Sequence, residues 1–109
     1  MELKPFIFER EAALAKDFTL KLTLDYGVIA QLETLYEPRS ILHLLGELPK
    51  VGSVMTQFLF FMTRKHHPDL SHDVIAGIQY SKKHGKVVLA LLGAIMKDAF
   101  NLEPAKTDG

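Results

Sequence analysis

The stretch FTLKLTLDYGVIAQLETLY, residues 18–36, decides the fold, because a two-residue hydrophobic period changes within it to a helical one. One face of its first part is apolar and the other carries Thr and Lys, which predicts a half-buried strand over residues 18–24. The apolar residues of this strand are Phe18, Leu20, Leu22 and Leu24. Asp25 is placed to accept from the first free N–H groups of a following helix. The apolar residues on one face of that helix are Val28, Leu32, Leu35 and Tyr36.

The predicted strand needs a neighbour, because a lone strand leaves its backbone groups unpaired. Residues 5–8, which include Phe6 and Phe8, are aromatic and β-branched and could supply the second strand of a hairpin. The connector, residues 9–17, is rich in Ala and charge and predicts a helical turn or a long loop. The alternative is that residues 18–24 pair with their copy in a second subunit, so that the strand edge forms a homo-oligomer. Both pairings remain open at this point.

Three helices are expected between the first helix and residue 84, with Ser40, Ser53 and Ser71 as their N-caps. The first carries Ile41, Leu44, Leu45 and Leu48. The second, residues 54–65, carries Met55, Phe58, Leu59 and Met62. The third carries Val74, Ile75 and Ile78 and is expected to end near residues 82–84. Gly85 would then be its left-handed C-terminal cap.

The last expected helix, residues 86–100, is apolar around more than half of its circumference. Its main face consists of Val88, Leu91, Leu92 and Ile95, and Leu89, Met96 and Phe100 widen it. Together these patterns predict a mainly α fold. Four to five short helices would pack around one core, with a short N-terminal β-strand or hairpin.

Length and composition predict a single domain over residues 1–109, with flexible ends at 1–4 and 104–109. The 13 Lys and Arg residues balance 13 Asp and Glu residues, so no net charge favours nucleic acid or an anionic membrane as partner. The chain has no cysteine, which excludes disulfides and thiolate chemistry. The longest apolar run, residues 87–96, is about half of the roughly 20 residues that span a bilayer. We therefore expect a cytoplasmic protein without a signal peptide.

The densest set of metal-ligand residue types is His66, His67, Asp69, His72 and Asp73. Imidazoles and carboxylates at this spacing can bind a divalent ion. However, Pro68 and the cap at Ser71 already explain the segment as a polar turn between helices. The serines are better explained as helix caps than as nucleophiles, and the dispersed glycines form no phosphate loop. The sequence therefore predicts no catalytic residue, no metal and no cofactor.

The segment that begins at Arg64 and ends at Lys86 is basic, with five Lys or Arg and four His against two acidic residues. As a helix, turn and helix it could contact a DNA groove. The outward residues of its second helix are Gln79, Lys82 and Lys83, which suit phosphate contacts rather than base readout. A small helical DNA-binding regulator is therefore the alternative function, and nucleic acid is the less favoured partner.

The order of these patterns resembles the small tail assembly chaperones of long-tailed phages and gene transfer agents. The resemblance covers about residues 18–100 and rests on the Leu32-Glu33 pair, Ser40 before a Leu-rich turn, the Pro68-Asp69-Leu70-Ser71 turn and the apolar last helix. The chain departs from the family at residues 9–17, where the family tends to have a short Gly-containing turn.

The resemblance implies a protein that is not an enzyme. Such chaperones bind the hydrophobic tape measure protein in the bacterial cytoplasm and keep it soluble until tail tube subunits polymerise around it. The tail tube protein is a possible second partner. Apolar residues beyond the needs of one small core usually mark protein contact surfaces, although tight internal packing is the alternative. From helical position, the residues expected to bind the partner are Phe60, Phe61, Leu89, Met96 and Phe100.

Overall fold

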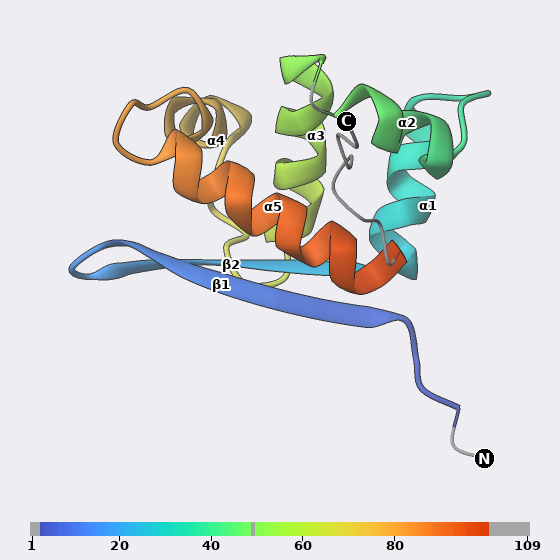
Figure 1. Cartoon of the computed structure of the whole chain (residues 1–109), viewed down its shortest axis with the longest axis horizontal. Coiled ribbons are helices and arrows are strands. Elements are labelled where there is room, and N and C mark those ends of the chain that lie inside the picture. The colour runs from blue at the N-terminus through green and yellow to red at the C-terminus, as the bar shows by residue number, and fades with distance from the viewer. Residues whose placement is uncertain (1–2, 49, 101–109) are drawn as a thin grey trace, which may run out of the picture.

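The computed structural model describes residues 3–48 and 50–100, which form an antiparallel β-hairpin and five helices. The hairpin consists of β1 (Ile7–Ala15) and β2 (Phe18–Asp25). The helices are α1 (Tyr26–Leu35), α2 (Ile41–Glu47), α3 (Gly52–Thr63), α4 (His72–Gln79) and α5 (Gly85–Phe100). All five helices lie on one side of the hairpin, so the molecule has a helical layer packed on a two-stranded sheet (Figure 1).

The strand of residues 18–24 pairs within the chain. Ile7 lies opposite Asp25 and Phe8 opposite Leu24 in an antiparallel register. The predicted hairpin is therefore confirmed for Ile7 and Phe8, whereas Pro5 and Phe6 precede the strand, and the hairpin extends much further, to Ala15. A register shift between Ala13 and Ala15 marks an irregularity just before the turn.

The prediction of a mainly α fold is wrong, since the fold is mixed α/β, with 55% of the described residues in helices and 18% in strands. Residues 9–15, expected as a helical turn or loop, belong to β1. Ala and Glu have low β propensity, but strand formation depends on what a segment pairs with and packs against. Here β2 supplies the ladder, and Arg10 of β1 forms a two-bond ion pair with Asp98 of α5, at 2.7 and 3.0 Å.

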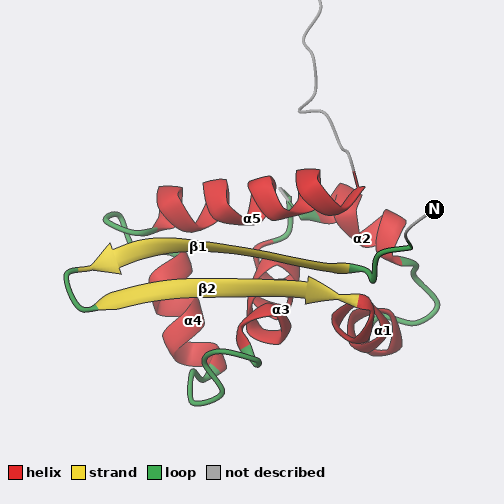
Figure 2. Ribbon diagram, turned by 90° about the horizontal axis from the view of Figure 1, so that it is seen from below, coloured by secondary structure: helices red, strands yellow, loops and turns green. Residues whose placement is uncertain are grey.

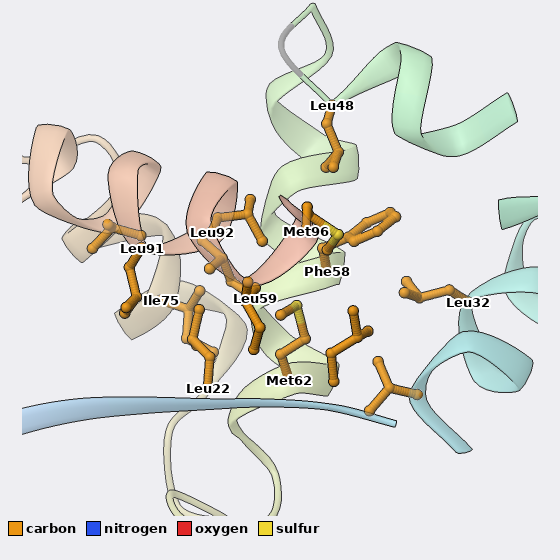
Figure 3. Close-up of a cluster of buried hydrophobic side chains, with 14 of the residues drawn as sticks. Leu22, Leu32, Leu48, Phe58, Leu59, Met62, Ile75, Leu91, Leu92 and Met96 are labelled. Atoms are coloured by element: carbon orange, nitrogen blue, oxygen red, sulfur yellow. The ribbon is translucent and has the colours of Figure 1, made fainter. Parts of the chain in front are cut away.

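The core lies between the hairpin and the helices, as the alternation in β2 predicts. Leu20, Leu22 and Leu24 are buried on the helical side of the sheet. Figure 3 shows how the side chains of β2 and of the helices meet there. The fully buried centre consists of Leu22, Leu24, Leu32, Leu44, Phe58, Met62 and Ile95.

Two of the three serine caps and the aspartate cap are confirmed. The backbone N–H groups of Val28, His43 and Val74 donate to the side chains of Asp25, Ser40 and Ser71, respectively. Ser53 is not a cap, because α3 begins at Gly52, two residues earlier than expected, and its N-cap is Val51, without a side-chain hydrogen bond.

Gly85 is not a left-handed cap either. The described glycines have no positive φ, α4 already ends at Gln79, and Gly85 is the first residue of α5. Glycine is needed there for another reason: a Cβ at this position would lie 2.7 Å from the carbonyl oxygen of Gln79. The close approach of two backbone segments thus explains the residue.

No described helix is both long and apolar enough to cross a bilayer. The expected flexible ends, residues 1–4 and 104–109, fall largely outside the described residues. Leu3 and Lys4 are described, and both are exposed.

Gly85→Ala and Gly93→Ala should change stability in opposite directions. The new methyl group at residue 85 meets a backbone oxygen that cannot move freely, so we expect a loss of about 1–3 kcal/mol in the free energy of unfolding. Gly93 lies exposed in the same helix, and a methyl group there would have no neighbouring atom within 4 Å, so alanine should add about 0.5–1 kcal/mol. Urea unfolding measures both values. An equal gain from both substitutions would contradict the close approach at Gly85.

Candidate functional site

The five residues expected to bind a partner do not form one surface. Phe60 and Phe61 are neighbours on α3, with ring centroids 5.5 Å apart, and both are partly buried. Met96 is only 4% exposed and belongs to the core, and Phe100 packs against that core. Leu89 is 51% exposed. Of the five, only Leu89 presents a large apolar surface to solvent.

Phe60 is held between two side chains of its own chain. The His72 ring stacks on it with centroids 3.6 Å apart, and the guanidinium carbon of Arg64 lies 3.9 Å from its centroid. Two groups this close to one centroid must lie on opposite ring faces, because they would overlap on the same face. Each such contact stabilises by roughly 0.5–1.5 kcal/mol. Phe60 therefore serves to tie the start of α4 to α3.

Arg64 organises the loop between α3 and α4. Its guanidinium donates to the carbonyl oxygens of Phe60 at 3.0 Å and Pro68 at 2.8 Å, and also to that of Leu70. These bonds use donors that a phosphate contact would need. The basic segment of residues 64–86 thus retains its lysines, but not Arg64, for an external partner.

Three of the four histidines of this segment, His66, His67 and His72, have separate partners. His66 Nε2 lies 2.8 Å from a carboxylate oxygen of Glu9, and the backbone N–H of Lys21 donates to His67 Nε2 at 3.0 Å. His72 instead stacks on Phe60 of α3. Within residues 3–48 and 50–100, no three His, Cys, Asp or Glu side chains are grouped so that they could hold a metal ion.

The Glu9 carboxylate joins both strands to the loop between α3 and α4, which passes the free edge of β2 (Figure 2). Besides His66, the Thr23 hydroxyl donates to it at 2.8 Å, and the amino groups of Lys65 and Lys21 lie at 3.5 and 3.9 Å. The hydrogen bonds from His66 and then Thr23 lower the pKa of Glu9 from 4.5 to about 2. This histidine-rich stretch therefore has a structural use on the outer face of the sheet.

One concave site among the described residues is an open groove of about 590 Å³, where the start of α3, the end of α4 and the start of α5 meet. We call it the α3–α5 groove. Its apolar surface comes from Leu48, Met55, Tyr80 and Leu89, and its charged lining residues are Lys50, Lys82 and Lys86. Open apolar surface of this kind suits a protein segment better than a small, enclosed ligand.

Polar contacts hold the groove in shape. The Thr56 hydroxyl donates to the side-chain oxygen of Gln79 at 2.5 Å, and the Gln79 amide donates to the Gly52 carbonyl at 3.0 Å. These bonds fix the end of α4 against the first turn of α3. Gly52 has no side chain, and a methyl group there would overlap the Tyr80 hydroxyl. The glycine thus lets the Tyr80 ring, which is 67% exposed, lie beside α3.

Most residues of this groove were not predicted. Leu89 was expected to bind a partner, and Gln79 and Lys82 were named only as possible phosphate contacts, whereas Tyr80, Lys50 and Lys86 were not named and Met55 was expected in the core. The sequence does hold one signal: Tyr80 follows a helix with a thin apolar stripe and precedes Ser-Lys-Lys, so an aromatic residue stands among polar ones. Helical periodicity could not identify it, because Tyr80 lies just beyond the end of α4.

The stability of the chain should depend on His67 near neutral pH. Burial, followed by the nearby charges of His66 and Arg64, lowers the pKa of His67 below its ordinary 6.5. The unfolded chain then binds a proton at a higher pH than the folded chain does. The free energy of unfolding should therefore fall as the pH drops through 6.5. Urea unfolding between about pH 5.5 and about pH 7.5 measures this slope.

His67→Gln should flatten the slope, because its amide oxygen can still accept from Lys21 but takes up no proton. His84→Gln is the matched control, since the His84 side chain makes no hydrogen bond to another described residue. Equal slopes in wild type and His67→Gln would contradict the assignment. Glu9 affects stability at lower pH. Because its pKa is about 2 in the folded chain and 4.5 ordinarily, the free energy of unfolding should fall as the pH drops from 4.5 to about 2.

Comparisons of the chain with protein-family models, with curated protein sequences and with solved structures gave no match.

Proposed function

We propose that this protein is a tail assembly chaperone that binds the tape measure protein of a phage or prophage and keeps it soluble while the tail tube forms. Its site of action would be the cytoplasm of the bacterial host. The observation that carries the proposal is the α3–α5 groove, in which Leu89 and Tyr80 are more than half exposed. Covering such apolar surface with a partner removes it from water and so lowers the free energy of the system.

The groove suits a helical segment of a partner. Its walls are helix ends, and its apolar surface includes Met55, whose unbranched side chain adapts to different partner shapes. An amphipathic helix of the tape measure protein would place apolar side chains there at i, i+3 and i+4 spacing. This proposed role requires only binding and no catalysis, so we do not propose an enzymatic activity. The tail tube protein and a second copy of the chain are further possible partners.

Co-expression with the tape measure protein encoded nearby tests this function. We expect the wild-type chain to keep that protein in solution and to elute with it in size exclusion with light scattering. Leu89→Asp should reduce the soluble complex about tenfold, because it removes apolar contact surface and places a charge against the apolar side chains of the partner. The fold should persist, since Leu89 is already half exposed.

Leu42→Asp is the matched control, because Leu42 is also a largely exposed helical leucine but does not line the groove. It should leave the complex unchanged. If the wild-type chain stays alone in solution while the tape measure protein precipitates, the proposed function is wrong. If both variants still form the complex, the groove is not its site.

Gly52→Ala should test the shape of the groove without loss of stability. The methyl group displaces the Tyr80 hydroxyl, which lies at the end of a movable side chain, so the free energy of unfolding should change by less than about 1 kcal/mol. The Tyr80 ring must then move within the groove. We expect several-fold weaker tape measure binding, measured by the same co-elution. Full binding would show that the position of Tyr80 does not matter.

A further inference from the structure

The charge around the α3–α5 groove is one-sided. Lys50, Lys82 and Lys86 line it, and all three are exposed. Its lining contains neither Asp nor Glu. Among the described residues, none of these lysines has an ion-pair partner. The chain has no net charge, so this is a local concentration of positive charge rather than a general property.

The position of these lysines is electrostatically unfavourable in the free protein. The N-terminal end of a helix carries a partial positive charge, which favours Asp and Glu and disfavours Lys. α4 follows this rule, with Asp73 in its first turn. The other four helices have no acidic residue in their first turns, and α5 alone has a lysine there, Lys86, with Lys82 and Lys83 just before it. An anionic group bound here would relieve this repulsion.

We infer that the α3–α5 groove recognises an amphipathic helix that carries acidic side chains beside its apolar face. This inference rests on the proposed function, because it specifies the segment of the partner that the groove holds. The apolar side chains of the helix would cover Leu89 and Tyr80. Its carboxylates would lie against Lys82 and Lys86 at the start of α5. Charge would thereby fix the orientation of the bound helix.

A protein helix fits the groove better than nucleic acid does. Leu48, Met55 and Leu89 give the groove an apolar surface, which a phosphate backbone would leave uncovered. The lining contains one aromatic residue, Tyr80, and no arginine, the residue that most often reads bases and clamps phosphates. Nucleic acid is therefore the less favoured ligand, and the experiment below includes it as a competitor.

The test uses two fluorescent helical peptides of about 18 residues with the same apolar face. Leu and Phe occupy the apolar positions of both, and the flanking positions carry Glu in one peptide and Lys in the other. Fluorescence anisotropy at about 50 mM and about 300 mM NaCl measures their dissociation constants. We expect the acidic peptide to bind at least about tenfold more tightly at low salt and to lose most of this advantage at high salt.

The variant Lys82→Glu/Lys86→Glu should weaken binding of the acidic peptide about tenfold or more. Its fold is not at risk, because acidic residues are favoured at the start of a helix. Lys4→Glu/Lys16→Glu makes the same change in charge at two exposed lysines outside the groove, and should have little effect. A single-stranded oligonucleotide serves as the competitor.

Equal binding of the two peptides, or unchanged binding by Lys82→Glu/Lys86→Glu, would overturn the inference. Displacement of the acidic peptide by less oligonucleotide than unlabelled peptide would also overturn it and assign the lysines to nucleic acid.

Co-expression separates this inference from the proposed function. If Lys82→Glu/Lys86→Glu solubilises the tape measure protein as well as wild type does, the chaperone function is supported and the recognition of an acidic helix is contradicted. If the wild type discriminates the peptides but does not solubilise that protein, the chaperone function is contradicted and the recognition of an acidic helix is supported.

Discussion

The structure depends on the mutual burial of the hairpin and the helices. An isolated two-stranded hairpin is marginal in water, and short helices gain most of their stability from packing an apolar face. Leu20, Leu22 and Leu24 provide that contact from β2, and Phe58 and Ile95 meet the same core from α3 and α5. Neither layer would bury its apolar side chains without the other. The alternation in residues 18–24 is therefore the sequence feature on which the remaining elements rely.

Local signals predicted the elements that local physics decides. The period of two in β2 and the caps at Asp25, Ser40 and Ser71 were all readable from the sequence, because a side chain and its own neighbours determine them. β1 was predicted only at its start. Its Ala-rich and charged part becomes a strand because β2 pairs with it, and this long-range partner has no local signature. The mainly α prediction failed for that reason.

The site was harder to predict than the fold. Phe60 was expected, from its helical position, to bind a partner. His72 and Arg64 cover it instead, and they reach it from the following helix and loop. Met96 similarly belongs to the core. The α3–α5 groove combines the ends of three helices, so its shape depends on where each helix stops. Helix ends are the least certain part of a sequence-based prediction.

The first turns of α4 and α5 differ in how they follow the preference for acidic residues at a helix N-terminus, and the difference points to a candidate site. Asp73 in α4 agrees with the local field, and the stability of the helix explains it fully. The lysines around the start of α5 oppose that field and pair with no described residue. A sequence usually breaks a local preference where something outside the element compensates for it. At α4 nothing needs compensation, whereas at α5 the acidic helix that we propose for the adjacent groove would supply the compensating charge.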